Sequence, residues 1–149
     1  GILDALQKDA RLSNKELAAQ VGLAPSSCLA RVRKLRSDGI FTGFHARVDP
    51  KAVGINLQAL VSVRLRRHSR DQFDSFRTFV LGLEPVVALY QLAGKDDFLI
   101  HVATRDADHL RDLVLDQLVG HDDVAHMETS VIFQYDRHAV APVYLDVSG

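Results

Sequence analysis

The sequence is poor in the residues from which several protein classes are built. A single cysteine, Cys28, stands among 149 residues, which excludes an internal disulfide framework and fits a reducing cytoplasm. No apolar run approaches the roughly 18 residues of a membrane span, and no signal peptide is visible. Because the chain opens at Gly1 inside a helical pattern, we expect native residues before it. The 47% apolar and 25% charged contents are typical of a soluble globular protein.

Motifs of the common enzyme and metal-binding classes are also missing. The seven histidines form no H-E-x-x-H motif and no close ligand cluster. His121 and His126 flank DDVA, a weak metal signal that surface polarity explains better. His101 alternates within a strand pattern, so we expect a packing or interface role. Neither a Ser/His/Asp order nor a glycine-rich phosphate loop is evident, and we expect no catalytic residue, no metal and no cofactor.

Charge is divided unevenly along the chain, whose net charge is −1. Residues 1–54 hold nine Lys/Arg against five Asp/Glu, giving +4, and residues 55–149 hold nine against fourteen, giving −5. The asymmetry indicates two modules, the first with a polyanion partner. Chance scatter of charge is the simpler alternative.

Helix signals in the first module describe a helix-turn-helix. Ser13 and Glu16 form an S-x-x-E capping box, which satisfies two unpaired amides at a helix start. Gly22 ends that helix, Pro25 suits the first turn of the next, and Gly39 stops the second. Two helices joined by a short glycine-containing turn match a helix-turn-helix unit. The stretch that follows, IFTGFHARVD, alternates as a short strand or wing does.

The second of these helices is basic on the side away from its apolar stripe. Ser27, Arg31 and Lys34 fall opposite that stripe, and Arg33 and Arg36 lie toward its flanks. A helix of this kind fits the DNA major groove, where arginine and lysine reach phosphates or guanine edges. A solvated basic face is the alternative. The expected DNA-binding residues are Ser26, Ser27, Arg31, Arg33, Lys34 and Arg36.

From residue 57 the pattern becomes that of alternating strands and helices. LQALVSVRLRR is a half-buried strand, and Ser69 with Gln72 caps a helix that we expect to end at Pro85. VVALYQLA and FLIHVAT are strands around the turn GKDD, DADHLRDLVLDQL is a helix, and VAHMETSVIFQY is the last strand. The order β-α-β-β-α-β is that of the ferredoxin-like sandwich.

The predicted fold class is therefore α+β, with a winged helix-turn-helix followed by a ferredoxin-like βαββαβ domain. We place the first domain at 1–48, a hinge at 49–56, the second domain at 57–138 and a C-terminal tail at 139–149.

The motifs resemble those of the Lrp/AsnC (leucine-responsive and asparagine-responsive) family of transcriptional regulators. Its pattern G-L-S-P-x-x-C-x-x-R-V-x-x-L-x-x-x-G-x-I is nearly intact at 22–40. The family commonly has an N-cap serine where this chain has Ala24, a loss of typically about 1 kcal/mol. The second half resembles the family's amino-acid-binding regulatory domain, including a G-x-x-D turn at 94–97. The resemblance covers essentially the whole chain.

The resemblance implies an effector site at the turn LAGKDDF. An α-amino acid needs a carboxylate for its ammonium group and N–H donors for its own carboxylate, and this turn offers both. Met127 favours an aliphatic, aromatic or sulfur-containing effector. From the residues alone a plain hairpin turn is the alternative. The effector-binding residues that the resemblance implies are Gly94, Lys95, Asp96, Asp97, Met127 and Thr129.

The expected partners are double-stranded DNA, a small amino acid and a second copy of the chain, with no membrane. Two reading heads related by a two-fold axis reach two half-sites, and a ferredoxin-like sheet leaves one face for a second copy to cover. The resemblance implies further assembly, often to octamers. The expected function is sequence-specific transcriptional regulation, modulated by an amino acid bound between subunits. An enzyme, and a stand-alone amino-acid-binding or DNA-compacting protein, are the alternatives.

Overall fold

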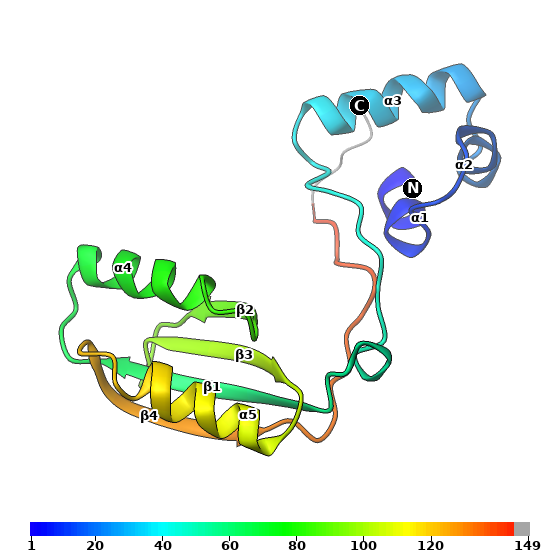
Figure 1. Cartoon of the computed structure of the whole chain (residues 1–149). Coiled ribbons are helices and arrows are strands. Elements are labelled where there is room, and N and C mark those ends of the chain that lie inside the picture. The colour runs from blue at the N-terminus through cyan, green and yellow to red at the C-terminus, as the bar shows by residue number, and fades with distance from the viewer. Residues whose placement is uncertain (145–149) are drawn as a thin grey trace. The chain divides into compact units, whose positions relative to one another are not determined.

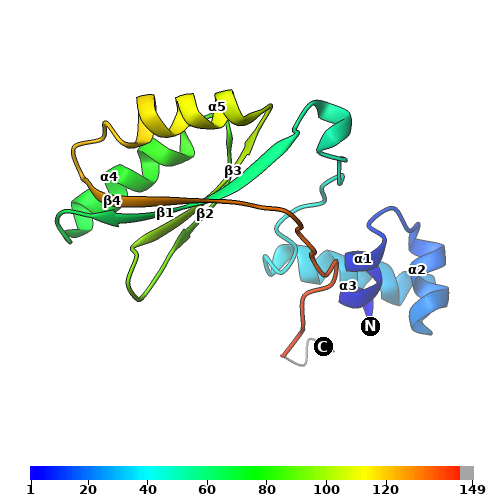
Figure 2. The ribbon, with the colours of Figure 1, turned by 90° about the horizontal axis from the view of Figure 1, so that it is seen from below.

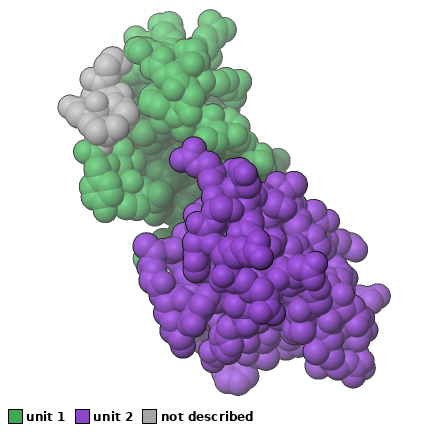
Figure 3. Space-filling view, turned by 90° about the vertical axis from the view of Figure 1, so that its left-hand side faces the viewer, with its two compact units in different colours: residues 1–47, 136–149 green, residues 48–135 purple. Residues whose placement is uncertain are grey.

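The computed structural model describes residues 1–144. The chain divides into two compact units, residues 1–47 with the segment that begins at Asp136, and residues 48–135 (Figure 3). No helix of the described residues is long and apolar enough to cross a membrane. The elements are α1 (Ile2–Lys8), α2 (Asn14–Val21), α3 (Pro25–Ser37), η1 (Lys51–Val53), β1 (Leu57–Leu65), α4 (Arg70–Leu81), β2 (Val86–Gln91), β3 (Phe98–Thr104), α5 (Ala107–Asp112), η2 (Leu113–Leu118) and β4 (Val124–Val131) (Figure 1).

The first unit is a small bundle of α1, α2 and α3. The predicted capping box starts α2: the Ser13 amide donates to Glu16 Oε2 at 2.8 Å, and the Glu16 amide donates to Ser13 Oγ at 3.3 Å. Hydrogen bonding from Ser13, first from its side chain and then from its amide, holds the pKa of the Glu16 carboxyl below its usual range. Gly22 ends α2 with φ 69°, a left-handed conformation that favours glycine. The core consists of Ala5, Leu6, Leu17, Ala18 and Cys28.

The stretch expected to form a strand or wing contains no strand. Residues 40–49 run without regular hydrogen bonding, because a strand needs a neighbouring backbone and the sheet of the described residues lies in the second unit. Instead Phe41 packs against the helical core, and its ring lies 5.6 Å from that of Phe44.

The second unit is built on an antiparallel sheet of order β2-β3-β1-β4. Every second residue of β1 is buried, as the predicted alternation requires; these residues are Ala59, Val61, Val63 and Leu65. Helices α4 and α5 lie on one side of the sheet (Figure 2). There Phe76 of α4 lies 5.2 Å from the ring of Phe98 in β3. The helices therefore cover the core on one side, and no helix of residues 48–135 lies on the opposite face of the sheet.

Both helices end differently from the prediction. Helix α4 ends at Leu81 with Gly82 as its C-cap, three residues before Pro85. The helix predicted over 106–118 becomes π-helical at η2, where the Val119 amide donates to Val114 O at 2.8 Å. The wider π turn brings residues five apart onto one face, so Leu113 and Leu118 both reach the core.

The segment after the second unit returns to the first. Gln7 Nε2 donates to Ala141 O at 3.3 Å, and the Ala141 amide donates to Gln7 Oε1 at 2.7 Å. The paired amide bonds tie the chain to α1. Residues 145–149 of the predicted tail lie outside the described residues.

A serine pair in α4 tests the capping argument within one helix. Ser69 Oγ accepts from the Gln72 amide at 3.3 Å, whereas Ser75 is exposed in the middle of the helix. We expect Ser69→Ala to lower the free energy of unfolding by about 1 kcal/mol. Ser75→Ala, the matched control, should leave it unchanged or raise it by a few tenths. Urea unfolding measures both, and equal effects of the two changes would contradict the capping role.

Candidate DNA interface and effector turn

Helix α3 presents all of the residues expected to contact DNA. Each of them is exposed; they are Ser26, Ser27, Arg31, Arg33, Lys34 and Arg36. The turn before α3 is held by backbone and side-chain bonds. The Leu23 amide donates to Ala18 O at 2.9 Å, and Asn14 Nδ2 donates to Pro25 O at 2.8 Å. Ala24, at the N-cap, makes no side-chain bond, so Asn14 reinforces this junction from α2.

Helical geometry reverses the expected facing of Arg31 and Arg33 on α3. The apolar stripe of α3 consists of Cys28, Val32 and Leu35; Cys28 and Leu35 are buried, and Val32 packs against the same core. At about 100° per residue, Arg33 and Lys34 lie about 130° from the middle of the apolar stripe, and Arg31 lies only about 65° from it. Arg33 therefore faces outward more directly than Arg31, the reverse of the expected arrangement, in which Arg33 lies at the flank of the apolar stripe.

The four basic side chains differ in their present contacts. Lys34 Nζ lies 2.8 Å from Asp38 Oδ2 in an exposed ion pair, and Arg36 Cζ lies 5.8 Å from the centroid of the Phe44 ring. Arg31 and Arg33 make no side-chain hydrogen bond or ion pair within residues 1–144. Their guanidinium groups are thus available to an outside acceptor, while Lys34 already uses one of its three N–H donors on Asp38.

The turn between β2 and β3 is fixed by its backbone. The Leu92 amide donates to Asp97 O at 2.8 Å, and the Asp97 amide donates to Val63 O at 2.9 Å. Gly94 has φ 148°, which side-chain-bearing residues rarely adopt. The amides of residues 93–96 donate to no other group of the described chain. They remain as donors at the tip of the turn.

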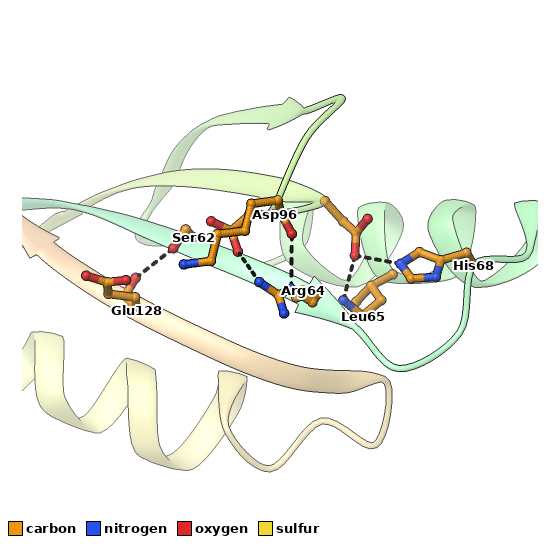
Figure 4. A network of polar contacts seen from close by, with 8 residues as sticks. Ser62, Arg64, Leu65, His68, Asp96 and Glu128 are labelled. Atoms are coloured by element: carbon orange, nitrogen blue, oxygen red, sulfur yellow. Dashed lines mark hydrogen bonds and ion pairs between the residues drawn. The ribbon is translucent and has the colours of Figure 1, made fainter.

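The two aspartates of this turn have different surroundings. Asp97 is only 14% exposed at its side chain. Its Oδ2 accepts from the Leu65 amide at 2.8 Å and lies 3.1 Å from His68 Nε2 (Figure 4). This carboxylate therefore fastens the turn to the end of β1. The Asp96 carboxylate, in contrast, makes one ion pair, with Arg64.

A residue that sequence reasoning missed, Arg64, lies beside Asp96. Arg64 Nε donates to Lys95 O at 3.0 Å, and its Nη2 is 3.8 Å from Asp96 Oδ1 (Figure 4). The side chain comes from β1, on the face away from the helices, since its neighbours Val63 and Leu65 are buried in the core. Its place in an alternating strand marks it as outward-facing, but no local pattern pairs it with a turn 32 residues later.

Within one subunit, Met127 and Thr129 lie on the opposite face of the sheet from the Arg64 side chain beside the turn of residues 94–97. They stand opposite Val63 and Val61 in the pairing of β4 with β1, and directly opposed residues share a face of the sheet. Met127 is partly buried against the helix-side core, and Thr129 is exposed. The Arg64 side chain lies on the other face.

The uncovered face of the sheet is apolar and hollowed. Its hollow, of about 520 Å³, is lined by Leu60, Tyr90, Leu99, His101 and the segment from Ser130 to Tyr135. The Phe133 side chain near it is 99% exposed. A face of this kind is unusual on a free monomer and marks an interaction surface.

His101 lies on this face with little water around it. It is 8% exposed, its Nε2 lies 2.8 Å from Gln58 Oε1, and its ring meets the edge of Tyr135 at 5.7 Å. Burial lowers the pKa of the imidazole, because a charged ring loses its hydration there. The packing role expected for His101 is what these contacts describe.

Among residues 1–144, no group of three or more His, Cys, Asp or Glu side chains is arranged to hold a metal ion. The ring of His121, part of the weak metal signal, packs at a tilt against that of Phe79, with ring centroids 4.5 Å apart. The edge of the Phe76 ring completes this aromatic contact.

Family comparisons match both units. Residues 1–42 match a winged helix-turn-helix DNA-binding family, and residues 58–137 match the Lrp/AsnC ligand binding domain. The second match alone covers more than half of the chain.

Individual relatives agree with the family match. The HTH-type transcriptional regulator AldR of Mycolicibacterium smegmatis is 46% identical over 93% of this chain and 81% of its own length. The leucine-responsive regulatory protein of Escherichia coli K12 is 35% identical over 89% of this chain and 81% of its own.

Among solved structures, a Neisseria meningitidis transcriptional regulator in complex with L-Met has TM-score 0.85 and 32% identity, covering 92% of this chain and 88% of that one. The relatives are named transcriptional regulators rather than enzymes. The chain is accordingly a DNA-binding transcriptional regulator with a ligand-binding domain, and it belongs to the Lrp/AsnC family.

Proposed function

We propose that this regulator binds specific DNA sites through α3 and that a small α-amino acid, bound between subunits at the turn of residues 94–97, modulates this binding. The observation that carries the proposal is the pair of unengaged guanidinium groups, Arg31 and Arg33, on the exposed side of the second helix of the helix-turn-helix. A DNA partner, together with the single cysteine, supports a cytoplasmic location.

The proposed DNA contacts differ in kind. Arg33 and Lys34 face outward and are suited to base edges or phosphates, and Arg31 and Arg36 to the flanking backbone. Ser26 and Ser27, near the helix start, are suited to a phosphate, because amides and hydroxyls gather there. Residues 1–48 form the proposed DNA-reading domain, 49–56 its hinge, 57–138 the sensing and assembly domain, and 139–149 the tail.

The proposed effector residues are the turn, Gly94 to Asp97, with Met127 and Thr129 supplied by a neighbouring subunit. Free amides at the tip of the turn support a carboxylate ligand, and Asp96 supports an ammonium group. The L-Met complex of the Neisseria regulator makes L-methionine the first effector to test. Asp97, already bonded to Leu65, is proposed to hold the turn rather than to touch the ligand.

A second copy of the chain is the proposed cover for the open sheet face. Leu60, Tyr90, Leu99 and the exposed Phe133 give that face an apolar surface, and removing this surface from water is favourable. The resulting dimer carries two DNA-binding domains, which can contact two half-sites of one DNA site. Further assembly of dimers, to octamers, is proposed by analogy with the family.

DNA binding through α3 predicts a change in salt dependence. Each lost phosphate contact should flatten the slope of log affinity against log salt by about one unit. For an Arg31→Ala/Lys34→Ala protein, we expect this slope to be flatter by up to about two units. We expect Arg33→Ala to weaken DNA binding at least as much as Arg31→Ala. Fluorescence anisotropy with DNA from upstream of the protein's own gene, at several salt concentrations and with random competitor, measures this.

The matched control for that experiment is Arg105→Ala/Arg111→Ala, which removes the same charge from the second unit. It should leave the slope unchanged. Equal binding by the wild type and the α3 variant would mean that the basic helix is only a solvated surface. Loss of binding without any sequence preference in the wild type would favour a DNA-compacting role instead.

The dimer proposal predicts that one charge on the open face disrupts assembly. Leu60→Lys places an unpaired ammonium group where the second sheet packs, which costs about 3 kcal/mol or more, equivalent to over about 100-fold in the dissociation constant. Ser75→Lys, which adds the same charge to the exposed side of α4, should have little effect. Sedimentation velocity measures both; a wild-type monomer, or unchanged assembly of Leu60→Lys, would contradict the proposal.

A further inference from the structure

Arg64 holds a guanidinium group beside the effector turn with most of its donors unused. One of five N–H groups, at Nε, donates to Lys95 O at 3.0 Å. The nearest carboxylate oxygen, Asp96 Oδ1, is 3.8 Å from Nη2, which is longer than the roughly 2.7–2.9 Å of a charge-assisted hydrogen bond. The other guanidinium N–H groups donate to no further residue among residues 1–144.

Hydrogen bonds to neighbouring residues hold both members of this ion pair. The bond to Lys95 O fixes the guanidinium from one side (Figure 4). Asp96 belongs to a turn that Asp97 fastens to β1 through the Leu65 amide. The Arg64 side chain is 39% exposed and that of Asp96 is 23% exposed. Both charges are thus partly shielded from water, and both remain reachable by a ligand.

A free α-amino acid has the complementary arrangement. Its carboxylate and its ammonium group are attached to the same carbon atom, so the two opposite charges are a few ångströms apart. A guanidinium group can give two parallel hydrogen bonds to a carboxylate, and a carboxylate accepts from an ammonium group. An amine lacks the first group, an organic acid lacks the second, and a residue inside a peptide lacks both.

We propose that Arg64 binds the α-carboxylate of the effector while Asp96 binds its α-ammonium group. This inference rests on the proposed function and adds to it a recognition residue, Arg64, and the division of the two charged groups of the ligand between Arg64 and Asp96. Asp97 has no such role because its oxygen is already bonded to the Leu65 amide and to His68. Selection for the zwitterion is then a property of the charge pair, separate from the choice of side chain.

Isothermal titration calorimetry with the full chain tests the proposal. The probes are L-methionine, its decarboxylated amine 3-(methylthio)propylamine, and its deaminated acid 4-(methylthio)butanoic acid. If another of the twenty amino acids binds the wild type more tightly, its own amine and acid replace these. We expect the wild type to prefer the amino acid over either analogue by about 10- to 100-fold, the range for a hydrogen bond between charged groups.

The variants separate recognition from support of the turn. Arg64→Gln should lower the affinity for the amino acid to that for the amine, without weakening the amine itself. Asp96→Asn should lower it to the affinity for the acid. Arg64→Lys keeps a charge but not the fork and should recover part of the preference. Arg67→Gln, which removes an exposed positive charge three residues away, is the matched control and should behave as the wild type.

The outcomes are distinguishable. If Arg64→Gln leaves the amino-acid affinity unchanged, or weakens amino acid and amine equally, Arg64 only supports the turn and the inference fails while the proposed function stands. If the wild type binds none of the twenty amino acids, the proposed effector function fails and the inference fails with it. Thermal unfolding of each variant shows whether it is folded, and Asp96→Asn tests the same pair from the other side should Arg64→Gln not fold.

Discussion

The alternation of side chains along β1 is the constraint on which the second unit depends. Ala59, Val61, Val63 and Leu65 point into a core that α4 and α5 seal, so the residues between them must point to the other face. No helix of residues 48–135 covers that face, and apolar groups such as Leu60 and Leu99 line a hollow there. One face is complete within the chain, and the other is suited to a second copy.

The same alternation decides which groups meet at the turn of residues 94–97, the proposed effector site. Arg64 leaves β1 on the uncovered side, next to Asp96, while Met127 stands opposite Val63 on the helix side. A site that uses both sets of residues therefore needs more than one subunit. This gives a physical basis for coupling, because a ligand that contacts two subunits binds one arrangement of subunits better than another. Only such a difference in affinity can shift an assembly.

Local patterns in the sequence predicted local features of the fold. Ser13 and Glu16 predict the start of α2, and Gly22 predicts its end. The period-two pattern locates the start of β1, which ends at Leu65, two residues before the predicted segment does. Each of these depends on neighbours within a few positions, where hydrogen bonding and side-chain direction follow directly from the sequence.

Features that depend on distant partners were not predictable in this way. The strand expected in residues 40–49 is absent because it has no neighbouring strand in its unit. The bonds between Gln7 and Ala141 join residues 134 apart, and Arg64 meets a turn 32 positions later. The charge of Asp97 suggested a ligand contact, and its bond to the Leu65 amide, 32 positions earlier, was not predicted. The relative facing of Arg31 and Arg33 in α3 is a local feature instead, since a turn of about 100° per residue is enough to place Arg33 further from the apolar stripe than Arg31.

The most direct test of the account is reciprocity between its two ligands. The affinity for DNA is measured with and without saturating amino acid, and the affinity for the amino acid is measured with and without saturating DNA. If one bound ligand changes the equilibrium for the other through assembly, the two ratios must be equal and different from one, typically by about 5- to 150-fold. Tight binding of both ligands with ratios of one would contradict the account, because the two units would then act independently.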